Sequence, residues 1–223
     1  MKYRDLYSQG IDKLSTENIP DAKVDARILL EYVCKTDRNA LFLQGDMEVK
    51  AEEEQVYLEL ISKRLSHIPL QYLTGEQEFM GYSFFVNENV LIPRQDTEIL
   101  VEEVAKLGSG KRILDVCTGS GCILLSLLHY SNDCAGTGAD LSEKALEVAA
   151  GNAVRLGLSP AFVHSDLFEN PQIEGNGKFD VIVSNPPYIA TAEIETLMDE
   201  VRLHEPMMAL DGTEDGLYFY RNI

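Results

Sequence analysis

Residues 185–188, "NPPY", follow the apolar run "FDVIVS" (179–184) and have the residue types to hold a planar –NH₂ group. The side-chain oxygen of Asn185 and the backbone carbonyl of Pro186 are two acceptors for its two N–H bonds. Consecutive prolines fix φ at about −65° and restrict the residue before each, so the direction of the carbonyl is stiff. Tyr188 adds an aromatic face on which a planar amide or base can lie. A strand terminator with a tight turn is the alternative interpretation of the same four residues.

A planar –NH₂ group needs such help because its lone pair is delocalised, which makes the nitrogen a poor nucleophile. Two acceptors in the plane of the group push electron density onto the nitrogen and aim its face at an electrophilic carbon. Positioning of this kind can supply on the order of several kcal/mol of the barrier. The motif therefore predicts a site that holds an amide or a base amine and aims its nitrogen at an electrophilic carbon.

A glycine-bearing turn, "LDVCTGSGC" (114–122), lies between a predicted strand and a predicted helix. Gly119 and Gly121 let the backbone pass close to a ligand, and the following helix presents free N–H groups. Asp140 ends the next strand, where a carboxylate can accept hydrogen bonds from both hydroxyls of a ribose. The third glycine of a dinucleotide fingerprint is replaced by Leu124, so a pyrophosphate fits poorly. The turn favours an adenosine-type ligand, with a structural turn or another nucleotide left open.

Asp166, at the end of the third predicted strand, faces the same crevice. An acid there can meet an adenine amino group, or it can cap a helix. Open α/β sheets bind ligands outside the carboxyl ends of their strands, where these acids and glycines gather. The pattern D-x-x-T-G-S-G with a downstream acid resembles that of the S-adenosylmethionine-dependent methyltransferases.

The elements that position these residues form an α/β fold. From residue 110 strands and helices alternate, which predicts βαβ units and a mainly parallel sheet, with Ser142 capping one helix and Gly157 ending it. Residues 1–65 read as helices, with inward stripes that include Val24 and Leu29 in one and Val56 and Ile61 in another. We expect a helical domain over 1–70, a linker with a β-hairpin and a helix over 71–108, and a Rossmann-like catalytic domain over 109–223. Asp96 or Thr97 is expected to cap the linker helix, and Glu98 to favour its first turn.

The net charge of the chain indicates which kind of partner it can bind. The chain has a net charge of −18, and residues 76–223 alone carry 9 basic and 24 acidic side chains, a net charge of −15. Nucleic-acid binding depends on Lys and Arg along the phosphates, so a nucleic-acid substrate is disfavoured. The four cysteines show no paired spacing, and no stretch approaches the length of a membrane span or a secretory signal. We expect a cytoplasmic protein with no metal site and no membrane contact.

A closer resemblance covers nearly the whole chain. "QYLTGEQEFMGYSFFVNENVLIPRQDTEILVE", "ILDVCTGSGCI", "SNPPYI" and "HEPMMALDGTEDGLYFYRNI", after a helical N-terminal domain, resemble the peptide chain release factor glutamine methyltransferases, the PrmC/HemK family. The resemblance implies methyl transfer from S-adenosylmethionine, with S-adenosylhomocysteine as product, to the side-chain amide of the glutamine in the Gly-Gly-Gln loop of class 1 release factors. It also implies that the helical domain helps to hold the protein substrate.

The resemblance assigns roles to individual residues. Asn185 and Pro186 would bind the glutamine amide, and Pro187 and Tyr188 would complete the catalytic pocket. The donor would be bound by Thr118, Gly119, Ser120, Gly121 and Cys122 on its methionine side, Asp140 at its ribose, Asp166 and Leu167 at its adenine, Thr97 from the linker helix, and Asn185. Asp96 and Glu98 are interpreted as helix-capping acids rather than catalysts. Cys117 stands where the family usually has glycine.

The family's fold continues for three strands beyond the predicted helix that contains Ile223, so we expect the last strands to be absent from this chain. Donor binding is then expected to survive at most weakly, and the full-length form is expected to be a monomer. Two alternatives remain: an amino methyltransferase acting on adenine or another base of a nucleic acid, and a non-catalytic module that binds a nucleotide or a partner.

Overall fold

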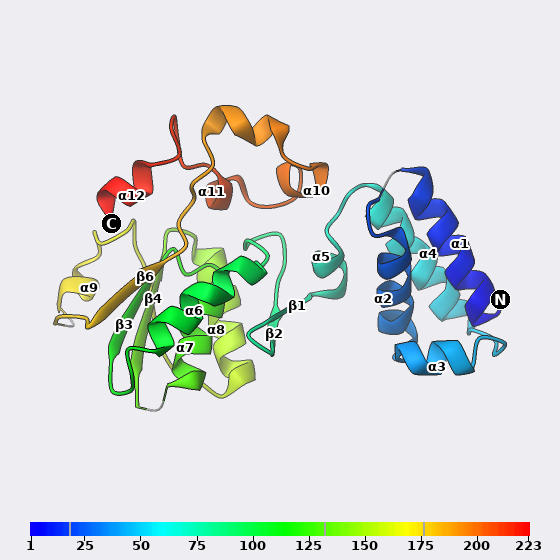
Figure 1. Cartoon of the computed structure of the whole chain (residues 1–223), viewed down its shortest axis with the longest axis horizontal. Coiled ribbons are helices and arrows are strands. Elements are labelled where there is room, and N and C mark those ends of the chain that lie inside the picture. The colour runs from blue at the N-terminus through cyan, green and yellow to red at the C-terminus, as the bar shows by residue number, and fades with distance from the viewer. Residues whose placement is uncertain (18, 132, 176) are drawn as a thin grey trace. The chain divides into compact units, whose positions relative to one another are not determined.

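The computed structural model describes residues 1–17, 19–131, 133–175 and 177–223, and the chain forms two compact units (Figure 1). The first unit comprises Met1–Thr74 together with Asp199–His204, and the second comprises Gly75–Met198 together with Glu205–Ile223. The hairpin and the helix of residues 71–108 lie within the second unit. No helix of the described ranges is both long and apolar enough to cross a membrane.

The first unit is helical, as the apolar spacing predicts. Leu6, Leu14, Leu29, Leu30 and Ile61 are fully buried and form its core. The helices are α1 (Tyr3–Thr16), α2 (Ala22–Cys34), α3 (Arg38–Leu43), α4 (Ala51–Leu65), α5 (Leu70–Thr74) and α10 (Asp199–Arg202).

The buried faces of α2 and α4 are rotated from the predicted ones. Val24 and Val56 are 43% and 45% exposed, so the predicted stripes are wrong at these two positions. Tyr57 is buried instead, and its hydroxyl donates to the carbonyl of Ala26 at 3.2 Å. Gly10 of α1 makes room for this ring, since a Cβ there would lie 1.9 Å from the Tyr57 hydroxyl oxygen. A glycine on one helix that admits a tyrosine from another sets the rotation, and apolar spacing within a single helix does not reveal it.

Residues 199–204, here called the strap, belong to the first unit although they lie far along the chain. The guanidinium of Arg64 is buried and binds Asp25 and Glu200, each with an N–O distance of 2.7 Å. The ring of His204 contacts the carbonyl of Ser66 at 2.8 Å. A charge that is buried needs partners, and Glu200 of the strap is one of the two carboxylates among the described residues that pair with Arg64.

The second unit is built on a four-stranded parallel sheet with the strand order β5-β4-β3-β6. The strands are β3 (Arg112–Val116), β4 (Ala135–Asp140), β5 (Ala161–His164) and β6 (Val181–Ser184), and the helices are α6 (Glu98–Ala105), α7 (Cys122–Tyr130), α8 (Glu143–Leu156), α9 (Pro171–Gly175), α11 (Met207–Leu210) and α12 (Tyr218–Asn222), with 3₁₀ turns at Gln95–Thr97 and Thr191–Thr196. The predicted α/β architecture is confirmed, including Ser142, whose hydroxyl accepts the N–H of Ala145.

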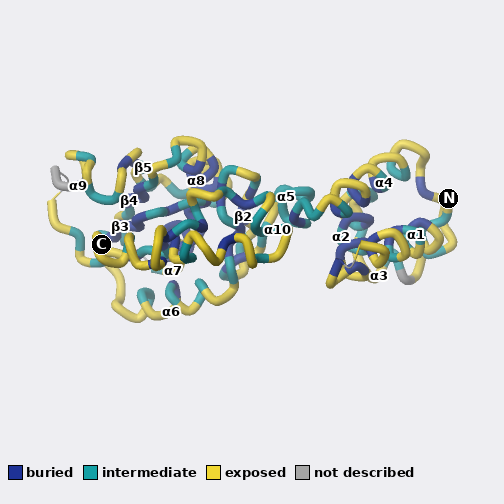
Figure 2. Tube along the Cα trace, turned by 90° about the horizontal axis from the view of Figure 1, so that it is seen from above, coloured by how far each residue is buried: buried dark blue, intermediate teal, exposed yellow. Residues whose placement is uncertain are grey.

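Each face of the sheet is covered. Ile113 of β3 and Val183 of β6 pack into one core with α6, α7, α8 and the hairpin, whereas Leu114 of β3 packs on the other face with α9. The trace through β3 and β4 is largely buried, most of α7 is buried as well, and α6 has an exposed outer side (Figure 2). Gly138 of β4 is required by close packing, because a Cβ there would lie 2.9 Å from the Phe162 ring. This packing fixes the carboxyl ends of the strands, where the site is expected.

A two-residue turn closes the predicted hairpin, β1 (Glu76–Phe79) and β2 (Tyr82–Phe85). Met80 and Gly81 have φ angles of 52° and 76°, the combination that matches the twist of a tight hairpin. The turn is held by Glu98, whose carboxylate accepts the Met80 N–H at 2.6 Å, and by Tyr130, which donates to the Met80 carbonyl at 2.9 Å. Glu98 lies in the first turn of α6, as predicted, but its side chain binds the hairpin and does not cap the helix.

Thr97 is the N-cap residue of α6, one of the two predicted alternatives, but its side chain does not cap the helix. The N-terminus of α6 has no side-chain cap hydrogen bond, and the preceding residues Gln95–Thr97 form a 3₁₀ turn that continues into the helix. A helix entered through another helical turn has backbone partners for its first N–H groups, so it does not need a side-chain cap.

Candidate functional site

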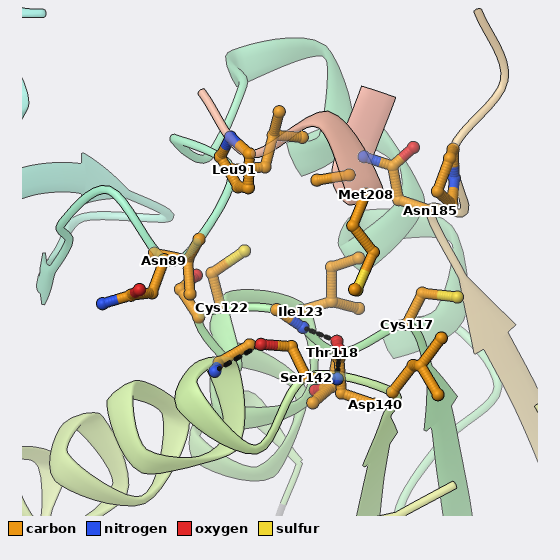
Figure 3. A pocket seen from close by; sticks show the side chains of 18 of the residues that line it. Asn89, Leu91, Cys117, Thr118, Cys122, Ile123, Asp140, Ser142, Asn185 and Met208 are labelled. Atoms are coloured by element: carbon orange, nitrogen blue, oxygen red, sulfur yellow. Dashed lines mark hydrogen bonds between the residues drawn. The ribbon is translucent and has the colours of Figure 1, made fainter. Parts of the chain in front are cut away.

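The carboxyl ends of the parallel strands open onto a pocket of about 220 Å³ in the second unit. Asn185 and Met208 lie across this pocket from Thr118 and Asp140 (Figure 3). Most of the predicted site residues line it, namely Thr97, Thr118, Gly119, Ser120, Cys122, Asp140, Asp166, Leu167, Asn185 and Pro187. Gly121, Pro186 and Tyr188 are predicted site residues that do not line it.

The glycine turn runs from the end of β3 to the start of α7 and keeps its backbone in the left-handed region. Cys117, Gly119 and Gly121 have φ angles of 60°, 55° and 79°. Space around Gly119 is open, so its backbone can approach a ligand, whereas Gly121 sits against Leu125 and Ala149 beneath the pocket. Gly121 therefore faces Leu125 and Ala149 rather than the pocket, and its left-handed backbone allows α7 to begin directly after the turn.

Asp140 joins the glycine turn to the end of β4. One carboxylate oxygen accepts the Gly119 N–H at 2.8 Å, and the other accepts the Ser142 N–H at 2.9 Å. Burial raises the pKa of this carboxyl, and the two backbone donors oppose the rise. Each oxygen has a further lone pair, so the carboxylate can also accept hydrogen bonds from a ligand in the pocket.

Asp115 is the first residue of the D-x-x-T-G-S-G pattern but was assigned no role from the sequence; it lies under the turn and is fully buried. One of its oxygens accepts the hydroxyl of Thr118 at 2.6 Å, and the other has no hydrogen-bond partner among the described residues. Burial, together with the nearby charge of Asp140, raises the pKa of Asp115 to about 7. The pattern marked the position of Asp115, but only the structure shows that its side chain is buried beneath the turn.

The two cysteines of the turn are not nucleophiles. Burial raises the pKa values of Cys117 and Cys122 to about 12, so both thiols stay protonated at neutral pH. Cys117 lines the pocket in a left-handed conformation that costs a residue with a Cβ about 1–2 kcal/mol. The geometry therefore allows Cys117 to act as a small residue in the pocket wall rather than as a reactive group.

Asn185 follows β6 directly, and its side chain reaches the linker helix. Its amide nitrogen donates to the hydroxyl oxygen of Thr97 at 3.4 Å, a long hydrogen bond. No described residue donates a hydrogen bond to the side-chain oxygen of Asn185. This orientation leaves the carboxamide oxygen of Asn185 as an acceptor.

The two prolines after Asn185 are buried, whereas Tyr188 is 58% exposed. The backbone beyond them pairs with a later segment: Ile189 donates to the Leu210 carbonyl at 3.1 Å, and Gly212 donates to the Ile189 carbonyl at 2.8 Å. Two glycines of that segment are needed for this fit. A Cβ at Gly212 would lie 2.8 Å from the Tyr188 Cα, and one at Gly216 would lie 2.3 Å from its carbonyl oxygen. The segment "ALDGTEDGL" thus supports the "NPPY" turn.

Two walls of the pocket were missed in the sequence-based assignment of site residues. One is formed by Glu88, Asn89, Val90, Leu91, Pro93 and Arg94, and the other by Pro206, Met208, Ala209 and Phe219. Glu205 joins them, because its buried carboxylate binds the Arg94 guanidinium and accepts the Ile92 N–H at 3.4 Å. The segments "QYLTGEQEFMGYSFFVNENVLIPRQDTEILVE" and "HEPMMALDGTEDGLYFYRNI", which carry the family resemblance, contain all of these residues. Their resemblance to the family was the available signal.

Comparison with known families divides the chain in two. The PrmC N-terminal domain family matches residues 5–75, and the methyltransferase small domain family matches residues 94–210. Two proteins named release factor glutamine methyltransferase, from Clostridium acetobutylicum and Clostridium botulinum, are 42% and 39% identical to this chain. Each alignment covers the whole of this chain and 80% of the relative. The chain belongs to the release factor glutamine methyltransferase family.

The enzyme class follows from this membership: the chain is an S-adenosylmethionine-dependent methyltransferase. Among solved structures, the catalytic domain of hMettl16 in complex with the MAT2A 3′UTR hairpin 6 is similar with a TM-score of 0.50. That similarity covers 78% of this chain and 62% of the other at 16% identity, so it shows a shared fold alone. Residues 76–93 of this family member, which contain the hairpin and most of the first missed wall, lie between the two matched domains.

Proposed function

We propose that this chain methylates the side-chain amide nitrogen of the glutamine in the Gly-Gly-Gln motif of class 1 peptide chain release factors. The observation that carries the proposal is the pairing of family membership with one pocket lined by both the glycine turn and Asn185. The relatives' names give a release factor as the substrate of those proteins, and the resemblance extends over the whole of this chain.

The residues of the pocket fit S-adenosylmethionine. The turn offers open space at Gly119, and the Asp140 and Asp166 carboxylates stand at the ends of β4 and β5. Asp140 is suited to the ribose hydroxyls and Asp166 to the adenine amine, with Leu167 beside it. Thr118, Ser120 and Cys122 would border the methionine side. When bound, the donor supplies a methyl group on a sulfonium, and the protein's task is to hold the acceptor in line with it.

On the acceptor side, Asn185 and Pro186 provide the two oxygens. The Thr97 hydroxyl holds the amide nitrogen of Asn185, which supports the orientation that turns its oxygen to a substrate N–H. In this proposal Thr97 acts on Asn185 as well as bordering the donor. The Pro186 carbonyl accepts no hydrogen bond from the described residues, so it is available for the second N–H. Pro187 and Tyr188 enclose the amide, and no general base is assigned because the proton on the methylated nitrogen can leave to water.

Charge supports a protein substrate over a nucleic acid. Residues 76–223 have a net charge of −15, which repels a phosphate backbone. The relatives' names do not favour the alternative of base methylation. We infer a cytoplasmic enzyme that acts as a monomer on a release factor, with the helical unit helping to hold that substrate.

The decisive experiment incubates the protein with labelled donor and, separately, a class 1 release factor, RNA and DNA. We expect mass to be added to the Gly-Gly-Gln peptide alone. Asn185→Ala should abolish turnover and leave the Kd for S-adenosylhomocysteine within several-fold, because the side chain acts on the acceptor. Label in nucleic acid and none in the release factor would refute the proposal, and a collapse of donor binding in the variant would refute the role of Asn185.

A further inference from the structure

Asn152 of α8 lies outside the pocket, yet its side chain binds two of the segments that form it. The residue is 1% exposed. Its carboxamide oxygen accepts the Phe85 N–H at 2.7 Å, and its amide nitrogen donates to the Phe85 carbonyl at 3.0 Å and to the Ser120 carbonyl at 2.9 Å. All three bonds have ordinary lengths for strong N–H···O contacts.

The two partners belong to different segments that form the donor pocket. Ser120 is in the glycine turn and lines the pocket. Phe85 is the last residue of β2, and the chain reaches the pocket wall at Glu88 only three residues later. The hairpin is already held at its other end by Glu98 and Tyr130, so the bonds at Phe85 fix the end from which the wall departs.

The side chain at this position must be a carboxamide of this length. One acceptor and two donors are needed at a single buried point, because Phe85 presents both an N–H and a carbonyl and Ser120 presents a second carbonyl. An aspartate offers acceptors only, and an alanine leaves three backbone groups of the two segments without a partner. Buried polar groups without a partner are costly, so either change should let the two segments separate.

We propose that Asn152 is a positioning residue for the methyl donor: it sets the spacing between the glycine turn and the 88–94 wall by joining Ser120 to Phe85. This inference rests on the proposed function, because its binding test takes the donor to be S-adenosylmethionine. Asn152 touches neither Asn185 nor Pro186, so its effect is on donor affinity rather than on the acceptor.

The test compares Asn152→Ala and Asn152→Asp with Leu128→Ala. Leu128 is a matched control because it packs against the same core and contacts the Gly136 region of β4, but does not line the pocket. Calorimetry should show the Kd for S-adenosylhomocysteine raised at least about tenfold in both Asn152 variants and unchanged in the control. In turnover, KM for the donor should rise in parallel while kcat at saturating donor stays within about threefold.

A second measurement does not depend on the donor. Hydrogen exchange of the free protein should be faster in Asn152→Ala for peptides covering both 85–94 and 117–124, and Leu128→Ala should not accelerate these two together. Unchanged exchange in either peptide, or a fall in kcat at unchanged donor affinity, would overturn the role of Asn152. If the unaltered protein fails to bind S-adenosylhomocysteine, the proposed donor is wrong, and the exchange data still decide whether Asn152 couples the two segments.

Discussion

Replacing Asp115 by asparagine should stabilise the protein at neutral pH, although the residue lies beneath the glycine turn of the proposed donor pocket. In the folded chain the pKa of this buried carboxyl is about 7, whereas an unfolded aspartate titrates at about 4. Asparagine keeps an oxygen that can accept the Thr118 hydroxyl and has no charge to desolvate. The variant therefore removes the cost of ionising Asp115 in a site where one of its oxygens has no partner among the described residues.

The sign of the effect follows from proton binding. Between about pH 4 and about pH 7 the folded state holds a proton that the unfolded state has lost, so stability falls as the pH rises through this window. A difference of about three pKa units corresponds to about 4 kcal/mol, since each unit is worth about 1.4 kcal/mol. The advantage of Asp115→Asn over the unaltered protein should therefore be smallest near pH 4 and should grow to at most about 4 kcal/mol above pH 8.

The assay is urea unfolding followed by circular dichroism from pH 4 to pH 8, because the chain contains no tryptophan for fluorescence. Glu147→Gln, which removes an exposed carboxyl from α8 of the same unit, is the control and should show no such trend. A difference between Asp115→Asn and the unaltered protein that is flat with pH, or that shrinks as pH rises, would refute the reasoning.

Three further substitutions test other parts of the pocket. Asp140→Asn should raise the Kd for S-adenosylhomocysteine about 10- to 100-fold, because hydrogen bonds to a charged group contribute about 1.5–3 kcal/mol, and calorimetry that finds no change would remove Asp140 from the donor site. Gly216→Ala should lower kcat at least about tenfold with donor Kd unchanged, because the added Cβ would meet the Tyr188 carbonyl at 2.3 Å and displace the "NPPY" turn; a normal kcat in single-turnover assays would contradict this. Glu205→Gln should reduce the free energy of unfolding by about 2 kcal/mol, because Arg94 loses its charged partner, and unchanged urea unfolding would show that this ion pair does not stabilise the unit.

Much of the catalytic unit could be predicted because it is encoded locally. Alternating strand and helix patterns placed β3, α7, β4 and α8 where they are found, and parallel strands bring their carboxyl ends to one edge. Asp140, Gly119 and Asn185 could therefore be assigned to one pocket without a structure, since each ends a strand or follows one directly.

The sequence-based predictions that were wrong concern residues whose contacts are distant in sequence. The stripe through Val56 was wrong because its neighbour Tyr57 is buried instead and packs against Gly10. Glu98 does not cap its helix because its partner is the hairpin turn at Met80. In each case a local rule was outweighed by a contact that forms only when separate elements come together.

The sequence by itself determined the strand ends, the glycine turn and the position of the "NPPY" turn after β6, because periodicity and short motifs act within a few residues. Only the tertiary structure decided that Asn152 joins Ser120 to Phe85, that Glu205 joins the two missed walls, and that the glycines of "ALDGTEDGL" support Tyr188. The physical reason is that hydrogen-bond satisfaction and close packing are conditions on three-dimensional neighbours. Two groups 32 or 113 residues apart must meet in a buried place before either condition exists.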